Sequence, residues 1–267
     1  MITSLLVATA LLGAKPAFAD VVKKFPTATL PITISEPAPQ KESLSAAEID
    51  TLGVLKNRSS SLKGLREAKP SELSPVALIQ RPNLLLLLLR LDRVAEAYEL
   101  KHTYLLAYDA KGTLLSGVLF HASNGGEGGG ESNVSTLDES GALSRQIKAW
   151  YPFDESLVPG EVTTSWEQPA KLTAAGTFEL TPPKWSKRDG FFRDPKSDEE
   201  LVVIGNRIFY RSPKKGTAEE LEVDGKTVRF KGSPKPYVLA WNDRLSELTC
   251  KNPDGTVQVF ARFKWDW

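Results

Sequence analysis

The spacing of apolar positions changes from helical to strand-like near residue 81. Upstream, Ser45 and Glu48 have the spacing of a capping box, in which each side chain accepts a hydrogen bond from the backbone N–H of the other residue. Apolar residues surround this box at helical spacing: Leu44, Ile49, Leu52 and Leu55. The pattern predicts a short helix over residues 46–56, inside a segment, residues 20–80, that is otherwise extended and rich in proline.

From residue 81 onward, short apolar stretches alternate with tight turns, which is typical of antiparallel strands. The run Leu84–Leu91 is apolar except for Arg90, and its length favours a strand buried on both faces. Four turns have a side-chain hydrogen-bond acceptor followed three positions later by glycine: Asp109–Gly112, Asp138–Gly141, Thr173–Gly176 and Asn252–Gly255. Each predicts a hairpin built on a type I turn followed by a left-handed glycine.

Two tighter turns predict hairpins whose register the loop determines. The loop at residues 205–206 joins strands that are apolar on both faces, so we expect this hairpin to lie mid-sheet or between layers. The loop at residues 224–225 would place Leu221 opposite Val228. The other face of this hairpin would then carry a charge pair, Glu220 with Arg229.

These patterns predict a mainly β protein of antiparallel hairpins and a meander, forming a sandwich or a small barrel-like domain, with a short N-terminal helix. We expect four segments along the chain. They are a signal peptide (1–19), an extended and partly helical segment (20–80), a β-meander region (81–190) and a compact all-β domain (191–267).

Residues 1–19 have the layout of a secretory signal peptide. An apolar run, Leu5–Ala14, of roughly 10 residues is too short to cross a bilayer, which needs about 20. It is followed by Pro16 and by Ala17-Phe18-Ala19, a run with small residues at the positions that a signal peptidase reads. We therefore expect an exported protein, in the periplasm or outside a bacterial cell, that is cleaved after Ala19.

Charge and cysteine content narrow the classes of partner. The chain has 34 Lys+Arg and 33 Asp+Glu, so it lacks the basic excess of nucleic-acid binders and the polybasic segments that bind membranes. Cys250 is the single cysteine, which excludes an internal disulfide, and no cysteine is placed to carry a lipid anchor. Because Cys250 alternates with Leu248, we expect its side chain to be small, buried packing.

Sequence motifs for catalysis, metal binding or cofactor binding are absent. The turn at 109–112 brings the two histidines near each other, with His102 opposite His121 or Phe120, but two imidazoles without a carboxylate are too few for a metal site. The glycine-rich stretch 125–130 lacks the lysine and the helix of a phosphate loop, and we expect a hairpin loop there. We therefore expect no catalytic residues, no metal and no cofactor.

The six tryptophans are the remaining candidates for ligand contacts. Their ordinary role is packing in the core and between sheets. The cluster Trp150-Tyr151-Pro152-Phe153 is the aromatic group most suited to an exposed platform, and a carbohydrate or a protein is the ligand it would take.

The C-terminal residues alternate between apolar and polar side chains, with Val257, Val259, Ala261, Phe263, Trp265 and Trp267 on one face. This pattern resembles the final strand of bacterial outer-membrane barrels, and the resemblance implies a membrane barrel. The other predicted strands are shorter than a membrane barrel needs and have prolines between them. The alternative is a terminal strand whose apolar face closes the core of a soluble domain.

We expect an exported, soluble, β-rich protein that acts by binding or in association with the cell envelope, without catalysis. Two alternatives stay open. One is an outer-membrane β-barrel component, and the other is a secreted hydrolase whose active-site residues are dispersed along the sequence.

Overall fold

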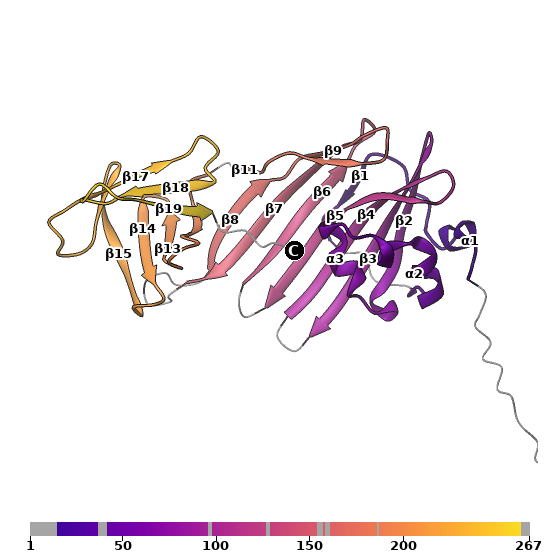
Figure 1. Ribbon diagram of the computed structural model, residues 1–267, viewed down its shortest axis with the longest axis horizontal. Helices are drawn as coiled ribbons and strands as arrows, with labels where there is room; N and C mark the ends of the chain where they lie inside the picture. The colour runs from indigo at the N-terminus through magenta and orange to yellow at the C-terminus, as the bar shows by residue number, and fades with distance from the viewer. Residues whose placement is uncertain are drawn as a thin grey trace, which may run out of the picture.

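The computed structural model describes residues 15–36, 42–95, 98–126, 129–153, 157, 161–185 and 187–262. It confirms the mainly β, antiparallel architecture that the sequence predicts. Figure 1 shows a large sheet, with short helices against one face, beside a closed barrel formed by the C-terminal strands.

The helical elements all precede the long strands. They are α1 (Phe18–Val22), α2 (Ala46–Leu52), α3 (Lys63–Arg66) and three 3₁₀ turns, Val54–Lys56, Ser60–Leu62 and Pro70–Glu72. The predicted capping box is confirmed at α2, where the Glu48 carboxylate accepts from the Ser45 N–H at 2.7 Å. α2 ends before residue 56 because Gly53 adopts a left-handed conformation, φ 72°, that terminates the helix. Among the described residues, no helix is long and apolar enough to cross a membrane.

In the described part of the chain, eleven strands form one large sheet. They are β1 (Ile32–Ile34), β2 (Leu73–Arg81), β3 (Leu84–Ala95), β4 (Tyr98–Asp109), β5 (Leu114–Gly126), β6 (Gly129–Leu137), β7 (Ala142–Pro152), β8 (Glu161–Glu167), β9 (Ala170–Leu172), β10 (Phe178–Leu180) and β11 (Lys184–Trp185). The main path runs β10-β9-β7-β6-β5-β4-β3-β2. All of its neighbouring strands are antiparallel.

The segment before α2 crosses one face of this sheet. Leu78 of β2 exchanges hydrogen bonds of 2.8 Å with Ala28 N–H and Pro26 C=O, and β1 then pairs with β6. Apolar side chains along the segment, including Leu30 and Ile32, pack on the buried leucines beneath. The N-terminal segment therefore joins β2 to β6 across the face opposite the helices.

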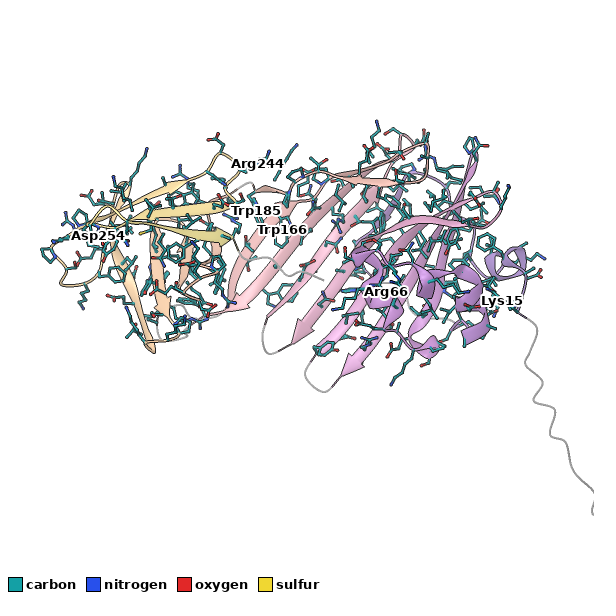
Figure 2. All side chains as sticks on the ribbon, viewed as in Figure 1. Lys15, Arg66, Trp166, Trp185, Arg244 and Asp254 are labelled. Carbon is teal, nitrogen blue, oxygen red and sulfur yellow. The ribbon has the colours of Figure 1, made fainter. Side chains whose placement is uncertain are left out.

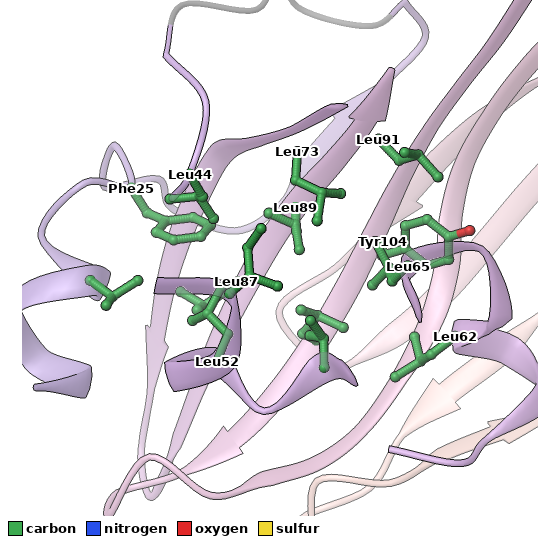
Figure 3. Packing of buried hydrophobic residues seen from close by; sticks show 14 of the residues in the cluster. Phe25, Leu44, Leu52, Leu62, Leu65, Leu73, Leu87, Leu89, Leu91 and Tyr104 are labelled. Carbon is green, nitrogen blue, oxygen red and sulfur yellow. The ribbon is translucent and has the colours of Figure 1, made fainter. Parts of the chain in front are cut away.

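Over residues 84–91, β3 is buried on both faces, as the sequence predicts. Leu87 and Leu89 point toward the helices, where they pack with residues such as Leu52 and Tyr104 (Figure 3). Leu86 and its neighbours on the other face pack beneath the N-terminal segment. Because each fully buried leucine contributes about 1.5–3 kcal/mol, this strand is central to the stability of the sheet.

The four predicted turns with glycine at the fourth position are confirmed. In the first, Gly112 N–H donates to Asp109 C=O at 3.1 Å with Gly112 at φ 82°, and in the last Gly255 repeats this geometry with Asn252 at φ 90°. Only glycine takes this conformation without strain, so each turn locks the register of its hairpin.

Within residues 187–262, eight strands form a closed barrel. They are β12 (Gly190–Arg193), β13 (Glu200–Ile204), β14 (Arg207–Ser212), β15 (Thr217–Asp224), β16 (Thr227–Arg229), β17 (Tyr237–Trp241), β18 (Glu247–Lys251) and β19 (Val257–Arg262). The hairpin at 205–206 lies between layers, as predicted. Val203 of β13 faces the barrel interior, whereas Val202 packs in the seam between the barrel and the large sheet.

The predicted register of the next hairpin is wrong: the loop lies one residue further along the chain, which shifts each cross-strand partner by two positions. The structure pairs Val223 with Val228 and Glu222 with Arg229, so the loop is Gly225-Lys226. Gly225 has φ 60° and occupies the first loop position, as a type II′ turn requires, whereas the prediction placed it second. The displaced Glu220 instead pairs across the barrel exterior with Arg207 at 2.7 Å.

For the last strand, the alternative in which the face of Val257 and Val259 closes the core is wrong over the described residues. Val257 and Val259 of β19 point outward and are 58% and 43% exposed, while Phe260 and Arg262 are buried. The face of β19 that turns into the barrel carries both apolar and polar residues. On this face, Phe260 and Gln258 of β19 pair with Leu248 and Cys250 of β18. The outer-membrane resemblance depends on residues 263–267, which lie outside the described residues.

Candidate ligand-binding cavity

The structure contradicts the predicted aromatic platform at residues 150–153 in one of its members, Phe153. Phe153 is buried, with its ring 6.2 Å from that of Phe191 and 6.3 Å from that of Phe209, in the seam between sheet and barrel. Trp150 is half-buried and lies against Gly130, while the side chain of Tyr151 lies outside the described residues. Trp166 and Trp185 also pack in the seam, with ring centroids 4.5 Å apart (Figure 2).

The two histidines lie on opposite faces of the sheet. His102 pairs with Ala122, and His121 pairs with Thr103, one position along β4. Successive strand residues point to opposite faces, so the imidazoles cannot share a ligand. Burial lowers the pKa of His102 to about 4 and also lowers the pKa of His121. The described residues contain no group of three or more His, Cys, Asp or Glu that could hold a metal.

A cavity of about 500 Å³ lies inside one end of the barrel. The turn that carries Asp254 is at this end, on the side of the barrel away from the large sheet (Figure 2). Side chains that alternate inward along the strands line it: Leu201, Tyr210, Leu221, Val228, Phe230, Tyr237, Leu239, Cys250 and Phe260. Polar side chains complete the wall, and a cavity of this volume with apolar and polar parts suits one small organic molecule.

Strand register explains why these side chains meet. Tyr210 on β14 stands between Leu201 on β13 and Glu219 on β15, and directly opposed residues share a face. On the other side of the barrel, Leu239 on β17 stands opposite Cys250 on β18. Closure of the barrel brings these two rows to face each other across the cavity.

Three aromatic rings form one part of the wall. Phe230 lies between Tyr210 and Tyr237, with ring centroids 4.9 and 5.1 Å away and interplanar angles of 85° and 72°. Such near-perpendicular pairs place a ring edge against a ring face, which is a favourable arrangement of aromatic quadrupoles. The three rings are half-buried, so each keeps part of its surface open to the cavity.

A polar network forms the rim beside the rings. The Gln258 side-chain amide donates to Glu199 Oε2 at 2.7 Å, to Asp194 Oδ2 at 2.8 Å and to Ser197 Oγ at 3.2 Å. Burial disfavours the ionised form of Glu199, but hydrogen bonds from Gln258 and Tyr210 and the charge of Lys215 outweigh it and lower its pKa. Glu199 therefore presents a fixed negative charge at neutral pH.

The remaining charged groups of the wall are Glu219 and Lys215. Glu219 Oε2 accepts a hydrogen bond from the Lys231 backbone N–H at 3.3 Å. Lys215 is exposed in the turn between β14 and β15. With Glu199, the lining carries two carboxylates and one ammonium group, a net charge of −1.

Cys250 lines the cavity but is poorly suited to nucleophilic chemistry. Burial, with a contribution from Glu199, raises the pKa of its thiol to about 11. The thiol is therefore protonated at neutral pH, and only a thiolate is a strong nucleophile. The buried position confirms the packing role that the sequence predicts.

A second cavity, of about 510 Å³, lies at the opposite end of the barrel. There the Arg188 guanidinium lies 4.8 Å from the ring centroid of Trp241. Lys226 is also part of the wall. This end is less enclosed by aromatic rings than the first, which makes the first cavity the stronger candidate for a ligand site.

Sequence reasoning missed the cavity residues, except for Cys250. Their inward alternation is visible in the sequence, but so is that of many solvent-facing strands. These side chains enclose a cavity only because β12 pairs with β19 and closes the barrel. This pairing joins residues about as far apart in sequence as the domain allows. A scan against protein-family models finds no match for this chain, and a search of the curated proteins finds none either.

Proposed function

We propose that this chain is a binding protein whose C-terminal barrel holds one small organic molecule with an apolar body. The observation that carries the proposal is the half-open cavity of about 500 Å³ at one end of the barrel, whose wall combines an apolar and aromatic part with a polar rim. Cavities of about 300–1,000 Å³ with a few fixed polar groups are typical of small-molecule sites.

The chemistry of the wall supports binding without catalysis. The thiol of Cys250 is protonated at neutral pH because its pKa is raised to about 11. Glu199 is held by Gln258 and is ionised, so it is not poised to exchange a proton near neutral pH. A ligand would therefore meet fixed contacts and no activated nucleophile.

We further propose that the protein is exported and acts in the periplasm or outside the cell. The support is the sequence pattern of residues 1–19, in which an apolar run precedes Ala17-Phe18-Ala19. A barrel that binds a small molecule in this compartment would act as a carrier or as a sensor, and its stability would come from packing because Cys250 is the only cysteine.

The proposal is tested with the neutral fluorescent probe N-phenyl-1-naphthylamine. We expect saturable binding of one probe per chain, with slower alkylation of Cys250 by iodoacetamide when the probe is bound, because this thiol lines the cavity. Binding without protection of Cys250 would place the probe elsewhere and would overturn the proposal.

A matched pair of variants locates the site. Val228 is buried and lines the cavity, whereas Val238 points outward and is 44% exposed. Val228→Phe should fill the cavity and weaken probe binding about tenfold or more, while Val238→Phe should leave it unchanged. Equal affinity in the two variants would contradict the assignment.

A further inference from the structure

The aromatic part of the cavity wall has the features of a site for a positively charged group. Tyr210 and Tyr237 stand nearly perpendicular to Phe230 on either side of it. The face of an aromatic ring is negative, so several rings turned toward one space attract a cation there. Neutral apolar ligands gain no such benefit from the orientation of the rings.

The charged residues of the wall also favour a positively charged ligand. Glu219 stands directly across the strand pair from Tyr210, so its carboxylate and that ring belong to the same inner face. Glu199 adds a second negative charge, and hydrogen bonds to its carboxylate hold it in place. Two carboxylates beside three aromatic rings would stabilise an ammonium group that has left water.

Among the described residues of the wall, Lys215 is the one cation, and its charge would repel a cationic ligand. It lies at the mouth, on an exposed turn, and its long side chain can turn to solvent when a ligand enters. The other lysines in the loops at this end, Lys196, Lys214, Lys231 and Lys235, are exposed and do not line the cavity.

We propose that the barrel cavity binds a small organic cation, with its ammonium group against Tyr210, Phe230 and Tyr237 and beside the Glu219 carboxylate. The inference rests on the proposed function, since it names the class of ligand for the same cavity. The apolar body of the ligand would lie deeper, against Leu239 and Phe260.

The test compares ligands of equal shape and different charge. Benzyltrimethylammonium and its carbon isostere neopentylbenzene are titrated against chain loaded with N-phenyl-1-naphthylamine, and displacement of the probe gives each affinity. We expect the cation to bind about tenfold more tightly than the isostere. Benzylphosphonate, an anion with a similar ring, should bind more weakly than both.

Three variants assign the preference to residues. Glu219→Gln and Phe230→Leu should each weaken binding of the cation about threefold to tenfold and leave neopentylbenzene nearly unchanged. Lys215→Gln should strengthen binding of the cation, because it removes the opposing charge. Lys226→Gln, at the other end of the barrel, is the matched control and should change neither ligand.

The outcomes separate this inference from the proposed function. If the probe binds but the cation and its isostere compete equally, the cavity is a ligand site without charge selection and the inference fails. If benzylphosphonate binds most tightly and Lys215→Gln weakens it, the cavity selects anions and the inference is overturned. If the probe itself does not bind, the proposed function fails.

Discussion

The guanidinium carbon of Arg262 lies 4.4 Å from the ring centroid of Trp185, which joins the last described strand of the barrel to β11 of the large sheet. Arg262 Nη2 also donates to the carbonyls of Lys187 and Arg188 at 2.8 and 3.0 Å. One buried side chain therefore holds the chain segment that connects the two β structures. Burial lowers the pKa of Arg262 to about 10, so it stays charged at neutral pH.

Replacing Arg262 should loosen the seam. Arg262→Ala removes the buried guanidinium together with the hydrogen bonds that it donates. We expect the free energy of unfolding to fall by about 2–4 kcal/mol. Urea unfolding followed by tryptophan fluorescence measures it. Arg207→Ala, which breaks an exposed ion pair with Glu220, is the control and should cost less than about 1 kcal/mol. Equal losses would mean that Arg262 does not stabilise the seam.

His102 should make stability depend on pH. Burial, aided by the nearby charges of His121 and Arg93, lowers its pKa from 6.5 to about 4. Between pH 6.5 and pH 4, His102 is therefore protonated in the unfolded chain and neutral in the folded chain. Stability is fully present above pH 6.5 and is lost as pH falls toward 4, by about 2–3 kcal/mol.

The measurement for His102 is the urea midpoint between pH 8 and pH 4, in the natural chain and in His102→Phe. The phenyl ring keeps the contact with Tyr104, whose ring centroid lies 6.0 Å away, and does not titrate. We expect a shallower fall with acid in the variant. Parallel curves for the two proteins would show that His102 titrates normally in the folded state.

Two glycines of the hairpin between β5 and β6 should differ sharply in their tolerance of alanine. A Cβ on Gly130 would collide with the Trp150 ring and the Asn124 carbonyl, whereas the nearest atom to a Cβ on Gly125 is 3.9 Å away. Gly130→Ala should cost about 1–3 kcal/mol, and Gly125→Ala should change stability by less than about 0.5 kcal/mol. The measurement is the melting temperature of each variant in thermal unfolding. Similar melting temperatures for the two variants would refute the packing of Trp150 on Gly130.

Cleavage after Ala19 should leave a folded but less stable chain. Phe18, with its ring 5.1 Å from that of Tyr108, would be lost, while buried Val21 would stay. A chain that begins at Asp20 should be about 1–3 kcal/mol less stable than one that begins at Lys15. The exposed ion pair of Lys15 with Asp50, 2.9 Å long, should account for little of this loss.

The mass of the protein recovered from the periplasm or the medium checks the cleavage itself, since cleavage after Ala19 leaves Asp20 as the first residue. Phe18→Ala in the longer chain should reproduce most of the loss in stability, and Lys15→Ala should not. A mass that includes Phe18 would contradict the predicted cleavage position.

The sequence correctly predicted those elements whose hydrogen bonds join residues close together in the chain. The Ser45–Glu48 capping box and the four turns ending in glycine form as predicted because their hydrogen bonds span only a few residues. The hairpin at 225–226 was misplaced because two turn types put glycine at different loop positions, and the sequence alone does not say which applies.

The candidate site was beyond sequence reasoning because it depends on long-range closure. The alternation along β19 predicts two faces, but the neighbouring strands determine which face turns into the barrel. In the structure Phe260 is buried and Val259 is exposed. Phe153 was predicted to be exposed because nothing local reveals that β12 and β14 pack over it.

The N-terminal segment that crosses the sheet has a consequence for the timing of folding. Thr33 of β1 bonds to Thr136 of β6 at 2.9 Å, although the two residues are 103 positions apart. β1, the first described strand, therefore cannot pair with β6 until about half of the protein has been synthesised. Topologies with such distant pairings fold slowly. In the export that we propose, such late pairing would keep the chain extended while it passes through a translocation channel.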